Sequence, residues 1–136
     1  MKKATFISLL LFITVFSINA QPITTTSPND DDKNAPIITF EKMIHDYGTV
    51  KENGNGVYEF KFKNTGKTPL ILTKPQSSCG CTIPDWPKEP ILPGKSSVIK
   101  VTYDTKKIGV INKEITVYSN SKDGSVKLSI KGNVIK

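Results

Sequence analysis

The sequence predicts an all-β protein: an immunoglobulin-like antiparallel β-sandwich of seven or eight strands, with no significant helix in the mature domain. Short stretches that alternate apolar and polar residues recur at intervals of about ten residues. Glycine, asparagine, aspartate and proline cluster between these stretches, as in turns. A chain of 136 residues that is 37% hydrophobic and 23% charged also fits one soluble domain with its own core.

The first 20 residues have the features of a secretory signal peptide. Met1-Lys2-Lys3 is basic, residues 4–18 are almost purely apolar, and Ala20 offers a small residue at the expected cleavage point. The apolar run is short for a bilayer span, which needs about 20 residues. We therefore expect a secreted protein, periplasmic or extracellular, with no membrane insertion after cleavage.

Residues 21–35 are predicted to be a disordered linker, and residues 36–136 the folded domain. The linker is polar and carries Thr24–Thr26 and Asp30–Asp32, so it has little apolar surface to bury. The net charge of +7 falls to +5 once Lys2 and Lys3 are removed. The chain has no arginine, the residue best suited to bidentate recognition of bases and phosphates. Its charge therefore predicts a solvated basic surface and no nucleic-acid partner.

The first half of the domain alternates clearly. Residues 58–63 place Tyr58, Phe60 and Phe62 on one face, which is typical of a half-buried strand. Two Asn-Gly pairs in residues 51–56 predict a turn, and Gly48 predicts a bulge. The expected strands are residues 37–40, 45–50, 58–63 and 70–72.

The second half contains the only two cysteines and a proline-rich segment. Residues 77–82 are expected to be extended, whereas residues 83–94 contain four prolines and predict an irregular loop across one end of the sandwich. Asp123-Gly124 predicts a hairpin turn. The remaining expected strands are residues 97–103, 113–119 and 126–130.

Three segments together resemble a known family. They are residues 45–50, residues 60–72 and Ser78-Cys79-Gly80-Cys81-Thr82, the last followed by Pro84, Trp86 and Leu92-Pro93-Gly94-Lys95. These motifs resemble the secreted bacterial family called domain of unknown function 1573 (DUF1573), over residues 37–136. The resemblance implies a PapD-like or major-sperm-protein-like immunoglobulin layout and an extracytoplasmic location. It implies no biochemical activity, because the family has none assigned.

Four roles remain open for Cys79 and Cys81. They can be buried structural residues, a disulfide, a soft-metal site or a nucleophile. In an extended strand their Cα atoms would lie about 6.6 Å apart, near the upper limit for a disulfide. We therefore predict no disulfide, with both sulfurs on one face of a strand. Two thiolates can bind Cu(I), and the copper-delivery factors of cytochrome oxidase, which also combine a sandwich with a Cys-x-Cys pair, are similar in this respect.

Other residues could contribute to a site. Met43 and His45 are possible additional copper ligands, although nothing in the sequence brings them near the cysteines. Trp86 is expected to cap the open end of the sandwich, or alternatively to contact a partner. No catalytic motif surrounds either cysteine, so we expect no enzymatic activity.

The leading hypothesis is a secreted, non-enzymatic immunoglobulin-like binding or scaffolding module of the bacterial cell envelope, with an unidentified protein partner and no cofactor. The alternative is a periplasmic thiol protein that binds Cu(I) or exchanges disulfides through Cys79 and Cys81. The sequence does not indicate an oligomeric state.

Overall fold

The computed structural model describes residues 31–136, and the predicted signal peptide and residues 21–30 lie outside the described residues. A short helix, α1 (Asp31–Asn34), precedes the sandwich and falls in the segment expected to be linker. Eight strands follow: β1 (Ile38–Phe40), β2 (Ile44–Lys51), β3 (Val57–Asn64), β4 (Gln76–Ser77), β5 (Thr82–Asp85), β6 (Ser96–Tyr103), β7 (Gly109–Tyr118) and β8 (Ser125–Ile135). This confirms the predicted all-β class.

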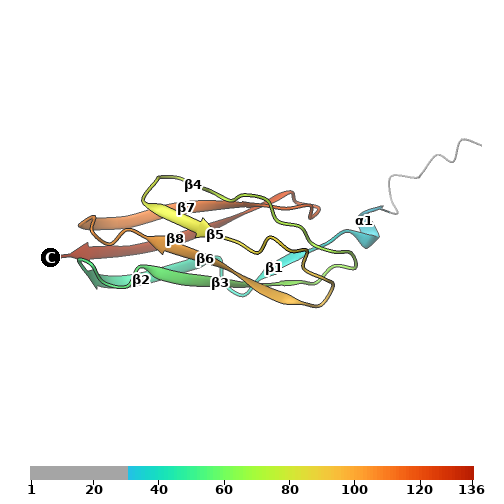
Figure 1. Cartoon of the computed structure of the whole chain (residues 1–136), viewed down its shortest axis with the longest axis horizontal. Helices are drawn as coiled ribbons and strands as arrows, with labels where there is room; N and C mark the ends of the chain where they lie inside the picture. Colours follow the sequence, from blue (N-terminus) through green and yellow to red (C-terminus); the bar gives the residue numbers. More distant parts are fainter. Residues whose placement is uncertain (1–30) are drawn as a thin grey trace, which may run out of the picture.

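The strands form two four-stranded sheets, ordered β1-β3-β6-β5 and β2-β8-β7-β4. Both sheets run along the length of the molecule, with α1 at one end and the C-terminus at the other (Figure 1). The expected antiparallel pairing holds except between β2 and β8, which are parallel. The parallel pair arises because the chain changes sheets between β1 and β2. Glu41 still donates to Lys61 in β3, whereas the Met43 carbonyl accepts from Ser129 in β8.

The core lies between the sheets and comes from the alternating positions that the sequence indicated. The side chains of Phe60, Phe62, Ile99, Val101 and Ile115 are almost entirely buried. Inward residues of one sheet pack on those of the other, as in other sandwiches. Gly48 has a φ of 62° and sits at a register shift in β2, so the predicted bulge is confirmed. Asn53 also has a φ of 62°, in the predicted turn.

Two expected elements differ from the structure. Residues 70–72 are not a strand, because Leu70 pairs with Ile91 while Leu72 pairs with Ser119. The proline-rich segment is also not wholly irregular, because its start forms edge strand β5. Cys81 accepts a hydrogen bond from Asp104 N–H, so the alternation of an antiparallel ladder turns the nitrogen of Pro84 away from β6. An edge strand tolerates proline at such a position.

Asn64 is a fully buried polar residue at the end of β3 that connects three segments. Its Nδ2 donates to the carbonyls of Thr68 and Ile91, each at 2.8 Å. Its Oδ1 accepts from Gly66 N–H at 3.0 Å. The side chain is 0% exposed, so no solvent can replace these partners. Asn64 therefore fixes the loop after β3 against the segment before β6.

This arrangement predicts a large effect of Asn64→Ala on stability. The substitution would leave buried backbone groups without partners, which should cost about 3 kcal/mol of unfolding free energy. Asn120→Ala is the matched control, because Asn120 also binds two backbone groups, Ile71 N–H and the Pro69 carbonyl, but is exposed. Water can replace those bonds, so the control should lose less than about 1 kcal/mol. Equal losses in urea unfolding would contradict the buried role of Asn64.

Candidate functional site

The cysteine segment is one of the turns at which the chain passes from one sheet to the other. It joins β4, at the edge of one sheet, to β5, at the edge of the other. Ser78 N–H donates to the Glu114 carbonyl of β7 at 2.9 Å, and the Cys81 carbonyl accepts from Asp104 N–H at 2.9 Å. Residues 78 and 81 are thus attached to different sheets, and Cys79 and Gly80 cross the gap between them.

Cys79 and Cys81 form a disulfide, so the prediction of no disulfide was wrong. That prediction assumed an extended strand, in which the two Cα atoms are too far apart. In the turn the Cα atoms lie 5.3 Å apart, within the usual range for a disulfide. The chain must bend to reach the second sheet, and this bend brings the two cysteines together.

Thr82 lies directly beneath the disulfide. Its Oγ1 is 3.8 Å from Cys79 Sγ and 3.9 Å from Cys81 Sγ. Thr82 is buried, and Cys81 is only 6% exposed, whereas Cys79 is only partly buried. The Ser77 hydroxyl donates to the Cys79 carbonyl at 2.6 Å and holds the start of the turn. One sulfur therefore faces the core and the other lies nearer to solvent.

Gly80 does not have a positive φ, so its backbone conformation is open to other residues. A Cβ added at this position would meet no atom within 4 Å outside its neighbours Cys79 and Cys81. Neither its φ nor a close contact beyond Cys79 and Cys81 therefore requires a glycine at this position. Gly80 therefore adds no side chain between the two cysteines.

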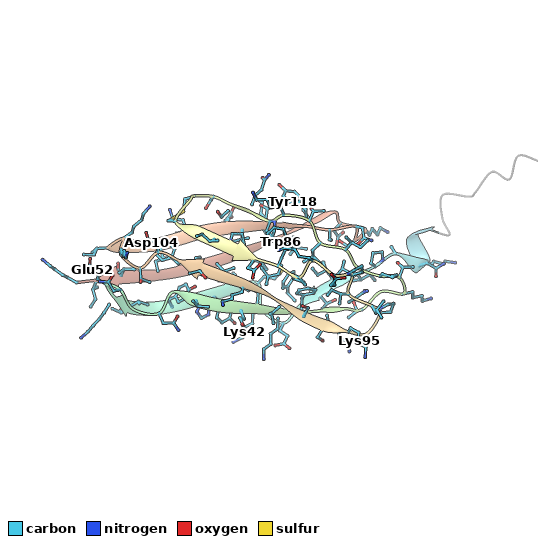
Figure 2. All side chains as sticks on the ribbon, viewed as in Figure 1. Lys42, Glu52, Trp86, Lys95, Asp104 and Tyr118 are labelled. Carbon is cyan, nitrogen blue, oxygen red and sulfur yellow. A yellow bond between two sulfur atoms is a disulfide. The ribbon has the colours of Figure 1, made fainter. Side chains whose placement is uncertain are left out.

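Trp86 follows β5 and lies along the side of the sandwich, not at an end as a cap (Figure 2). Its ring is partly buried against the core. The Lys88 ammonium lies 3.0 Å from the ring centroid and also donates to the Trp86 carbonyl at 2.8 Å. A cation over an indole face is a favourable contact. It holds the exposed part of the ring in one orientation.

Two shallow hollows flank the disulfide turn. The first, of about 510 Å³, lies between residues 53–57 and residues 102–106, and the second, of about 390 Å³, lies between residues 74–77 and Trp86. Gly80 and Ile83 line both hollows. Ile83 is 65% exposed, and among the large apolar side chains of residues 31–136 only Val110 is more exposed. We call the disulfide, Gly80, Ile83 and Trp86 the turn surface.

Charges around the turn surface are mostly positive. Lys74 lines the second hollow, and Lys106 lines the first together with Asp104. The Asp104 carboxylate accepts a hydrogen bond from the backbone N–H of Lys106 at 3.1 Å, so one of its oxygens already has a partner within the loop. A further hollow of about 500 Å³ lies beside Lys42, Tyr58 and Lys61, away from the cysteines.

Met43 and His45 lie on the opposite side of the sandwich from the cysteines. His45 belongs to β2, which is separated from β4 in its sheet by β8 and β7. Its ring stacks on Tyr58 with a centroid separation of 3.5 Å, and burial lowers its pKa, against the opposing effect of Asp46. Burial also raises the pKa of the neighbouring Tyr47 to about 12, with Tyr58 adding to the shift. These aromatic residues close this side of the sandwich. His45, the only histidine of the chain, is therefore too far from Cys79 and Cys81 to share a metal ion with them.

Among residues 31–136, no group of three or more histidine, cysteine, aspartate or glutamate side chains is placed to hold a metal ion. The two sulfurs are bonded to each other, so neither is a thiolate in this state. Cu(I) binding by Cys79 and Cys81 therefore stays a prediction for the reduced protein. The same part of the chain contains no helix long and apolar enough to cross a bilayer.

Sequence reasoning missed Thr82, Ile83 and Lys88. The alternation in Thr82-Ile83-Pro84 was a usable signal, since it puts threonine inward and isoleucine outward once residues 82–85 are accepted as a strand. Lys88, two residues after Trp86, gave no signal of a cation–π contact.

Comparison with known families gives one match. The model of the family described as "Protein of unknown function (DUF1573)" matches residues 38–134. No curated protein sequence matches this chain.

Solved structures share the fold at low sequence identity. A protein of unknown function from Porphyromonas gingivalis W83 is 15% identical, with a TM-score of 0.67, over 79% of this chain and 51% of that one. The PapD-like domain 7 of human CEP192 is 10% identical, with a TM-score of 0.60, over 90% of this chain and 99% of that one. The secreted serine protease VesC from Vibrio cholerae is 15% identical, with a TM-score of 0.52, over 77% of this chain and 24% of that one. This chain thus spans about half of the first structure and about a quarter of the protease. At these identities the likeness shows a PapD-like immunoglobulin fold.

The disulfide predicts the result of thiol counting. Purified protein that is unfolded without reductant and treated with an alkylating reagent should gain no label, because both sulfurs are in a bond. The same protein treated first with a reductant should gain two labels, which is the control for reagent access. Two labels without reductant would contradict the disulfide.

Proposed function

We propose that this chain, which belongs to the DUF1573 family, is a secreted, non-enzymatic binding module of the bacterial cell envelope that contacts a protein partner through the turn surface. The observation that carries this proposal is the 65% exposure of Ile83 between two hollows. An exposed apolar residue beside concave surface is typical of a binding site. The partner and the location are proposals that rest on the predicted signal peptide and on this surface.

The surface continues from Ile83 across the outer face of its sheet. Ile83 pairs with Thr102, and Thr102 pairs with Val57, so the three residues form one row across β5, β6 and β3. Val57 is also exposed, and it lines the first hollow. The row gives a partner two exposed apolar side chains, Ile83 and Val57, with Thr102 between them.

Rigidity favours this surface over the free strand edges. The turn is tied to both sheets, and Trp86 is held by Lys88. Binding therefore requires little ordering of side chains, which is a main cost of association. The outer edge of β5, by contrast, lacks a donor at Pro84, so it is poorly suited to pairing with an added strand.

The charges indicate the chemistry of the partner. Lys74 and Lys106 lie on either side of the turn, and the predicted mature chain is basic. A polypeptide segment with an apolar side chain for the Ile83 row and carboxylates on both sides complements this surface. Such contacts between opposite charges should weaken as salt screens them.

Site-specific photo-crosslinking in the producing cells tests this proposal. A photoreactive residue at position 83 should give one discrete protein adduct, whose yield falls at high salt and in the Lys74→Glu, Lys106→Glu variant. Position 63, on the same sheet face but away from the turn, is the matched control and should give no such adduct. Equal adducts at both positions, or none at position 83, would overturn the proposal.

A further inference from the structure

The disulfide contributes little to holding the turn. It links residues two apart, so it closes a very short loop and removes little freedom from the unfolded chain. The turn has its own hydrogen bonds to both sheets, including a second contact in which Glu114 N–H donates to Ser78 Oγ at 3.1 Å. A bond that is dispensable for the fold but displayed at the surface points to chemistry at the sulfurs.

We propose that the Cys79–Cys81 disulfide is a thiol–disulfide exchange site that oxidises a dithiol, with first attack at Cys79 Sγ. Cys79 is the more exposed of the two residues, and Cys81 faces the core. Gly80 lies between the two cysteines, lines both hollows and has no side chain that could hinder an approach to the sulfurs. Access of this kind is a main determinant of exchange rates. This inference does not depend on the partner proposed above, and it is compatible with a non-enzymatic module because each protein molecule oxidises one dithiol and is itself reduced.

The exchange balances in two steps. A thiolate of the incoming dithiol attacks Cys79 Sγ, which forms a mixed disulfide and releases Cys81 as a thiolate. The second thiolate of the dithiol then attacks the first dithiol sulfur, which is bonded to Cys79 in the mixed disulfide. This attack releases Cys79 as a thiolate. The dithiol loses two electrons and becomes a disulfide. Cys79 and Cys81 gain these electrons, and the two protons of the dithiol end in solvent or on the new thiols.

Thr82 stabilises the leaving group. Its buried hydroxyl is 3.9 Å from Cys81 Sγ and can donate a hydrogen bond when that sulfur becomes a thiolate. Hydrogen bonds to charged groups are stronger than those to neutral groups. Lys74 and Lys106 add positive charge near the turn, which favours the approach of an anionic thiolate, while Asp104 opposes it. A thiolate that is stabilised in this way leaves more readily.

The test follows the reaction of the oxidised purified protein with a synthetic Cys-x-x-Cys peptide by mass spectrometry. We expect one peptide disulfide to form for each protein reduced, and glutathione, a single thiol, to form a mixed disulfide at Cys79. No peptide oxidation by the folded protein, or a mixed disulfide at Cys81, would overturn the proposal.

Four variants separate access and leaving-group effects from folding. Gly80→Val should slow exchange by about tenfold, because it covers the approach to the sulfurs. Thr82→Val should slow it by roughly tenfold or more and raise the pKa of the Cys81 thiol, whereas Thr82→Ser should restore both. Thr49→Val makes the same chemical change on β2, on the other side of the sandwich, and should leave the rate unchanged. The thermal unfolding midpoint of each variant shows whether it folds. Folded Gly80→Val and Thr82→Val proteins that react at the wild-type rate would overturn the assignment of these residues.

Discussion

The need to join the edges of two separate sheets determines the geometry of the cysteine turn. Sheets in a sandwich lie about 10 Å apart, and the chain crosses this gap between Ser78 on one sheet and Cys81 on the other. An extended path along either sheet edge is impossible for those residues, so the chain bends and Cys79 and Cys81 come within bonding distance. The disulfide is thus a consequence of the sheet change. The second hollow, lined by residues 74–77 from one sheet edge and by Ile83 and Trp86 from the other, lies where the edges of the two sheets separate.

The two sides of the sandwich are closed in different ways. On the side of β2, His45 stacks on Tyr58, and the Tyr47 hydroxyl donates a hydrogen bond to the Gly56 carbonyl at 2.8 Å. These rings fill the gap between the sheets. On the side of β4 and β5, the gap is filled by the disulfide and Thr82, with part of Trp86. The chain therefore places its disulfide at the side of the sandwich where the edge strands of the two sheets meet.

The fold could be predicted from the sequence because its signals are local. The alternation of Tyr58, Phe60 and Phe62, the bulge at Gly48 and the turn at Asn53 all depend on residues within a few positions of one another. The site could not be predicted to the same extent, because it depends on which sheet each residue joins. The same two cysteines are too far apart in a strand and close enough in a sheet-changing turn. Whether Pro84 fits a strand also depends on which way its nitrogen faces, and pairing with β6 decides that.

Comparison of amide NMR spectra of the oxidised and the reduced protein tests the central claim most directly. The claim is that the scaffold holds the turn and displays the disulfide, so the fold should not depend on the bond. Reduction should therefore shift amide signals only near the turn surface, in residues 74–86 and 102–106, and leave β2, β3 and β8 unchanged. Shifts that spread through the core strands, or a loss of signal dispersion on reduction, would contradict the account.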